Sequence, residues 1–115
     1  FRISDLRNIR ISDFGLIVGD MIIGVLSFTL YLHGNRSLKA KRQVANSLRQ
    51  KLRNKFNVSV SEIENQDDHE RLDMAVVTLS NETTRVESHL QKALAMVEAV
   101  SSDEVANVQM EIFSA

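Results

Sequence analysis

The residues best suited to chemistry in this sequence are cations gathered in one run. Residues 36–56, RSLKAKRQVANSLRQKLRNKF, hold eight Lys or Arg and no Asp or Glu, although the whole chain has a net charge of −1. Lysine and arginine side chains bind nucleic-acid phosphates by releasing counterions, largely without regard to base sequence. The run therefore points to a surface for RNA phosphates, formed by Arg36, Lys39, Lys41, Arg42, Arg49 and Arg53.

The spacing of these cations predicts a shared helix face. A helix is expected over residues 38–56 with Ser37 as its N-cap. Its buried stripe is expected to be Leu38, Ala45, Leu48, Leu52 and Phe56, with Val44 at the margin.

A second stripe on this helix is basic. It has i, i+3/i+4 spacing and consists of Lys39, Arg42, Arg49 and Arg53. Lys41 falls near the centre of the apolar face, where its stem can cover the core while its ammonium emerges at the helix end. Because no acids are interspersed, the usual i,i+4 ion pairs are missing, which favours an external anion. The alternatives are an acidic protein partner and a merely solvated face.

Two loops also carry residue types that bind ligands. HGNRS, residues 33–37, is a glycine turn before a helix N-terminus, where backbone N–H groups and Arg36 could hold one phosphate. ENQDDHE, residues 64–70, contains adjacent Asp, His and Glu side chains, but neighbours on a hairpin tip rarely converge, so no metal site is expected. No nucleophile–base pair, P-loop or dinucleotide fingerprint is recognisable. We therefore expect no cofactor and no enzymatic activity.

Periodicity predicts the elements that position the basic helix. Strands are expected over residues 21–32, 57–65, 71–81 and 105–113, and a second helix over residues 82–100. A phase slip at Ser61–Glu62 predicts a bulge in the second strand. With right-handed crossovers, the order β-α-β-β-α-β predicts an α+β ferredoxin-like sandwich. In this fold a four-stranded antiparallel sheet carries both helices on one face.

Alternation predicts which side chains face the core. From the first strand these are Ile22, Gly24, Leu26, Phe28, Leu30 and Leu32. The second helix should bury Val86, Leu90, Ala93, Val97 and Val100, and the last strand Ala106, Val108, Met110 and Ile112. The opposite, open face of the sheet should carry Ile23, Val25 and Tyr31. Because an exposed apolar patch often marks an interface, a homodimer through this face is expected. With one tyrosine and no RNP-type motif, a base-stacking platform on the sheet is not expected.

Length, composition and charge distribution bound the class of protein. With 115 residues and 43% hydrophobic content, one domain is expected over residues 21–115. Residues 1–20 are expected to be a non-essential extension, either translated upstream sequence or an added segment; the alternative is a short element packed on the domain. No run reaches the roughly 18–20 apolar residues of a membrane span, and the chain has no cysteine, which is compatible with a cytoplasmic location. Residues 33–61 carry eight bases and no acids (+8), and residues 62–115 carry twelve acids and three bases (−9), which predicts one basic and one acidic surface.

Several motifs resemble those of the YlxP-like family, small bacterial proteins of unassigned function. They are Met21 opening the first strand, SLKAKR at 37–42, FNVSVSE at 56–62, and AVVTLSN at 75–81 followed by VE in the second helix. The resemblance covers about residues 21–113. It implies a ferredoxin-like fold and, because the family's genes often lie beside translation-initiation and ribosome-assembly genes, an RNA or ribosome context.

We therefore expect a non-enzymatic RNA- or ribosome-associated accessory protein. One alternative is a dimeric protein-interaction module. Another is a small phosphate-handling enzyme, since acylphosphatases share the fold and use an arginine in the loop that corresponds to HGNRS. Their longer glycine-rich motif is absent from this sequence.

Overall fold

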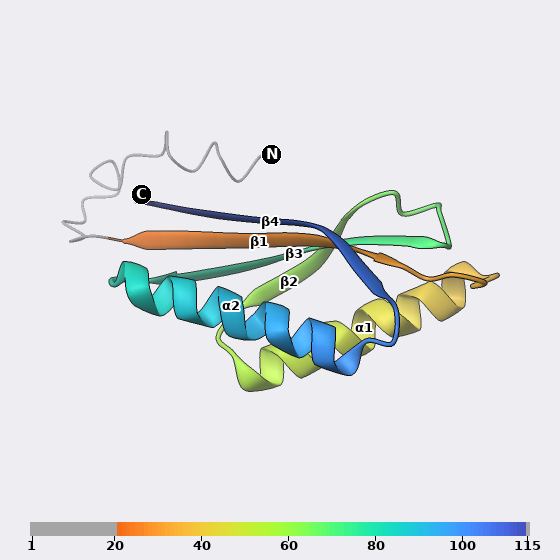
Figure 1. Ribbon diagram of the computed structural model, residues 1–115, viewed down its shortest axis with the longest axis horizontal. Helices are drawn as coiled ribbons and strands as arrows, with labels where there is room; N and C mark the ends of the chain where they lie inside the picture. Colours follow the sequence, from red (N-terminus) through yellow and green to blue (C-terminus); the bar gives the residue numbers. More distant parts are fainter. Residues whose placement is uncertain (1–20, 115) are drawn as a thin grey trace.

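In the computed structural model, which describes residues 21–114, one antiparallel sheet carries two helices on the same face (Figure 1). The elements are β1 (Ile22–Tyr31), α1 (Leu38–Lys55), β2 (Ser59–Glu64), β3 (Arg71–Ser80), α2 (Thr83–Val100) and β4 (Glu104–Ser114). The strand order is β2-β3-β1-β4. The predicted β-α-β-β-α-β ferredoxin-like fold is thus confirmed. The expectation for residues 1–20 lies outside the described residues. Neither helix within residues 21–114 is long and apolar enough to cross a membrane.

The basic helix begins where local chemistry favours a start. Gly34 adopts a φ of 79°, a left-handed conformation that suits glycine and lets the chain turn away from β1. Ser37 is extended, and its Oγ accepts the N–H of Ala40 at 3.0 Å, satisfying one of the free amides at the helix start. Asn35 donates from Nδ2 to the carbonyl of His69 at 2.6 Å. The loop before α1 is therefore tied to the β2–β3 hairpin.

The core lies between the sheet and the helices. As predicted, alternate positions of β1 face it, and Leu26, Phe28 and Leu30 are at most 2% exposed. Burying an aliphatic or aromatic side chain of this size stabilises the fold by roughly 1.5–3 kcal/mol. A Cβ on Gly24 would lie 2.3 Å from Cγ1 of Val86, so α2 approaches the β1 backbone too closely for any larger residue at this position without rearrangement.

Predictions for the margins of the core are partly wrong. Val100 is 45% exposed because it lies at the end of α2. Val108 and Met110 are 43% and 38% exposed because β4 is an outer strand of the sheet, where fewer neighbouring side chains cover them. A register shift between Ser27 and Thr29 also changes the alternation of β4. Ala106 pairs with Thr29, a residue of the open face, while Val105 packs against the core instead.

The bulge predicted in β2 is confirmed by a register shift between Glu62 and Glu64, one residue further along than expected.

The face of the sheet opposite the helices, the open face, differs between its two ends. At the start of β1 it is apolar, and Leu79 there is 58% exposed. At the end of β1 it is polar, with Tyr31 opposite Arg71.

Candidate nucleic-acid interface

The basic stripe predicted on α1 forms one flank of the helix. It consists of Lys39, Arg42, Arg49 and Arg53, with Asn46 between them. Arg42, Arg49 and Arg53 each directly follow a buried residue of the helix, so they share the flank beside the core. At a rise of 1.5 Å per residue, the stripe is about 21 Å long. Arg49 is half-buried and the other cations of the stripe are exposed.

The stripe cations have no acidic partners among residues 21–114. Ion pairs in this range form at Lys41, Arg71 and Arg85, and none forms at a stripe residue. Arg49 instead donates to the carboxamide of Asn46. The first turn of α1 contains no acid, so the positive end of the helix dipole adds to the field of Lys39. Arg36 lies exposed just before the helix. These charges are available to an external anion.

Lys41, by contrast, is buried. Only 1% of this residue is exposed, and its Nζ donates to the carbonyls of Asn65 at 2.7 Å and Asp68 at 2.6 Å. Oε1 of Glu62 lies 3.5 Å away. The prediction that Lys41 contacts phosphate is therefore wrong, because the β2–β3 hairpin folds over the start of α1 and encloses the ammonium instead of letting it emerge.

A polar cluster that the sequence did not suggest surrounds Asp73 of β3. This carboxylate is 5% exposed and accepts hydrogen bonds from Thr29 Oγ1 at 2.5 Å, Asn65 Nδ2 at 2.6 Å and Arg71 Nε at 2.9 Å. Burial raises the pKa of the Asp73 carboxyl, but the hydrogen bonds and the charge of Arg71 outweigh it, so the pKa lies below its ordinary value. The sequence signal for this cluster is a single acid in a strand whose central residues are apolar.

Two asparagines extend this cluster. Asn65 has a φ of 54° and Asn107 a φ of 53°, and they are the non-glycine residues with positive φ in residues 21–114. Asparagine tolerates this conformation better than most residues. Both lie beside a register shift, and bulges commonly redirect side chains. Nδ2 of Asn107 lies 3.3 Å from Thr29 Oγ1 and 3.4 Å from the hydroxyl of Tyr31. The cluster therefore continues across the open face to β4.

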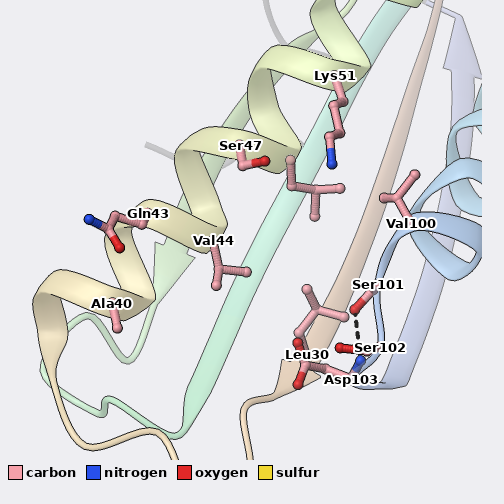
Figure 2. Close-up of a pocket in the computed structure, with 11 residues that line it drawn as sticks. Leu30, Ala40, Gln43, Val44, Ser47, Lys51, Val100, Ser101, Ser102 and Asp103 are labelled. Carbon is pink, nitrogen blue, oxygen red and sulfur yellow. Dashed lines mark hydrogen bonds between the residues drawn. The ribbon is translucent and has the colours of Figure 1, made fainter.

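A groove of about 460 Å³ separates α1 from the end of α2 (Figure 2). Its apolar lining is Leu30, Ala40, Val44, Leu48 and Val100. Lys51 points its ammonium into the groove, and Asp103 lies at the opposite end, where its backbone N–H donates to Ser101 Oγ at 3.1 Å. The groove lies on the other flank of α1 from the stripe. Nothing in residues 21–114 groups three His, Cys, Asp or Glu side chains that could hold a metal.

Comparison with known proteins identifies the family of this chain. Residues 23–110 match the model of the family described as "Protein of unknown function (DUF503)". The chain belongs to this family. A curated relative, "Uncharacterized protein YlxP" of Bacillus subtilis (strain 168), is 33% identical over 78 residues, which cover 68% of this chain and 85% of the relative. The predicted YlxP-like membership is confirmed.

Replacing Lys41 with Met keeps a buried stem of similar length but removes the ammonium. Hydrogen bonds from charged groups contribute roughly 1.5–3 kcal/mol each, so we expect the free energy of unfolding to fall by about 2–3 kcal/mol in urea denaturation. The matched control is Lys51→Met, an exposed position on the same helix, which should change it by less than about 0.5 kcal/mol. Equal stability of the two variants would contradict a structural role for Lys41.

Asp73 should make stability depend on acid pH. Because its pKa is lower in the folded than in the unfolded chain, the ionised carboxylate stabilises the fold above about pH 4, and this stabilisation is lost as the pH falls through the folded-state pKa. We expect the stability difference between the native chain and Asp73→Asn to be widest near neutral pH and to narrow below about pH 4. Urea denaturation across this pH range measures it, with the exposed Glu98→Gln as control. A difference that did not change with pH would contradict the role of the ionised carboxylate.

Proposed function

We propose that this protein binds RNA through the basic stripe of α1, joined by Arg36, and that it does so without catalysing a reaction. The observation that supports this most directly is a row of cations, on one flank of a helix, that pair with no acid among residues 21–114. Like charges at this spacing repel one another, which disfavours the folded chain unless an anion is bound.

Phosphate suits the stripe better than isolated carboxylates do. Three of its four cations are arginines, whose planar guanidinium donates two parallel hydrogen bonds to a phosphate. The stripe is about 21 Å long, which matches several consecutive phosphates of one strand. The acids of residues 62–115 would repel RNA from the rest of the molecule and so orient it on α1.

The similarity to the YlxP-like family supports a ribosomal context for this RNA, because genes of that family often lie beside genes of translation initiation and ribosome assembly. The proposed partner is therefore ribosomal RNA, either free or within a ribosomal subunit, and the proposed location is the cytoplasm.

Salt dependence tests the stripe. If three or four phosphates of single-stranded RNA are neutralised, the logarithm of the association constant should fall with the logarithm of salt concentration at a slope of about −2 to −3. Changing Arg42, Arg49 and Arg53 together to Gln should flatten this slope by about 2. The measurement is fluorescence anisotropy of a labelled ribosomal RNA fragment between about 50 and 300 mM salt.

The control for that experiment removes equal charge elsewhere. Lys51, Lys55 and Lys92 are exposed and lie off the stripe, so their combined replacement by Gln should leave most of the slope intact. Neither variant should lose stability, because glutamine has a helix propensity close to those of Arg and Lys and the arginine variant also loses the mutual repulsion along the stripe. Unchanged binding by the arginine variant with an intact fold, or equal loss in both variants, would contradict the stripe.

A homodimer through the apolar end of the open face is the alternative partner. Leu79 is 58% exposed there, beside the partly buried Val25 and Val77. Apolar association is weakened little by salt, in contrast to phosphate binding. Sedimentation velocity at micromolar concentration should then show a dimer at both low and high salt, whereas a monomer at all concentrations would remove this alternative.

A further inference from the structure

Three planar side chains meet at the polar end of the open face. Tyr31 closes β1 and lies opposite Arg71 of β3 in the sheet register. Cζ of Arg71 is 5.9 Å from the centre of the Tyr31 ring, within range of a cation–π contact. The ring of His33 lies 6.1 Å from that of Tyr31, with the two planes only 20° apart. The three groups form a small aromatic and guanidinium surface.

The side chains of this surface are accessible, and Arg71 is held in position by a buried carboxylate. Tyr31 is half-buried, His33 is exposed, and the side chain of Arg71 retains 36% exposure. The buried carboxylate of Asp73 accepts the Nε–H of Arg71, which sets the position of the guanidinium while its terminal nitrogens stay available. Asn107 approaches the Tyr31 hydroxyl from β4. A planar ligand would meet a surface that needs little reordering on binding.

Beside these side chains the open face is hollowed. The hollow has a volume of about 200 Å³, and Asn107, Gln109, Glu64 and Arg71 are among its lining residues. The two carboxamides offer both donors and acceptors, Glu64 accepts and Arg71 donates. This mixture of groups matches the edge of a nucleobase, which carries donors and acceptors side by side.

The charge around the surface favours a base over a phosphate. Glu104 pairs with Tyr31 from β4, and Glu64 lines the adjacent hollow. These carboxylates would repel a phosphate placed over the tyrosine ring, but they have little effect on the neutral face of a base. The phosphates of a bound strand therefore belong on the other side of the β1–α1 loop, where the cations lie.

The chain itself connects this surface to the stripe. The loop runs from His33 to Arg36 and then to Lys39 in the first turn of α1. Because His33 and Arg36 are three residues apart, their Cα atoms can be separated by at most about 11 Å. We infer that Tyr31, His33 and Arg71 form a base-stacking platform for single-stranded RNA, whose phosphates continue along the α1 stripe. This inference rests on the proposed function and names the form of RNA bound.

The proposal revises the expectation that the sheet carries no stacking platform. That expectation followed from the single tyrosine and the missing RNP-type motif. Neither the position of Arg71 across the sheet from Tyr31 nor the stacking of His33 on the same ring has a local sequence pattern.

Tyr31 provides a direct reporter, because it is the only tyrosine in the sequence. The full chain is titrated at low salt with a single-stranded oligouridylate of about twelve nucleotides and, separately, with an RNA duplex of equal length. We expect the NMR signals of the Tyr31 ring protons to shift with the single strand and to stay in place with the duplex.

Variants then measure the contribution of the ring. Stacking on one aromatic side chain typically changes affinity by about 5-fold to 100-fold, so Tyr31→Leu should weaken single-strand binding by that factor without changing the salt slope. Tyr31→Phe should recover most of the loss. If Tyr31→Leu folds poorly, the exposed His33→Leu replaces it, with the exposed His69→Leu as its control.

Each other outcome overturns a defined part of the proposal. If single-stranded RNA binds with the expected salt slope while the Tyr31 signals and the Tyr31→Leu affinity stay unchanged, the platform is wrong and the stripe stands. If no RNA binds in a salt-dependent manner, the proposed function is wrong and the platform with it. If the Tyr31 signals shift with protein concentration and not with RNA, a second copy occupies this face and the platform is wrong.

Discussion

The buried ammonium of Lys41 is the contact on which both polar surfaces of this protein depend. It holds the carbonyls of Asn65 and Asp68 over the first turns of α1, and so fixes the β2–β3 hairpin against that helix. The carboxamide of the same Asn65 donates to Asp73, which in turn fixes Arg71 on the far side of the sheet. Because a buried charge is tolerated only when its hydrogen bonds are satisfied, α1, the hairpin and β3 must take up their positions together.

Neighbouring cations of α1 have opposite physical roles. Lys41 faces inward and is satisfied by the chain itself, whereas Arg42, one position later and about 100° around the helix, faces solvent and pairs with nothing in residues 21–114. The first stabilises the fold, and the second, with its neighbours along the stripe, raises the electrostatic free energy of the folded chain. A helix selected for stability alone would intersperse acids, as i,i+4 pairs require. Here the acids lie outside the helix, twelve of the fifteen in residues 62–115.

How far the sequence could predict this structure follows from the range of each interaction. The helices and strands were predictable because apolar periodicity is local, and positions such as Leu48 and Leu26 lie where it placed them. The family was predictable from short motifs such as SLKAKR. The burial of Lys41 was not, because backbone carbonyls of a distant hairpin have no sequence signature. The Asp73 cluster and the shifted alternation of β4 likewise depend on two bulges whose partners lie on other strands.

Those bulges also bear on how copies of the chain can associate. In residues 21–114, β2 and β4 are the outer strands of the sheet, and each has an interrupted register. A long, regular outer strand offers its free backbone groups as a template for a strand of another molecule, and this is how cross-β fibres grow. An interrupted strand is a poor template, and the carboxylates of Glu62 and Glu64 flank the interruption in β2. The same irregularities that place Asn65 and Asn107 therefore also protect the sheet from growing by strand addition when the protein is concentrated.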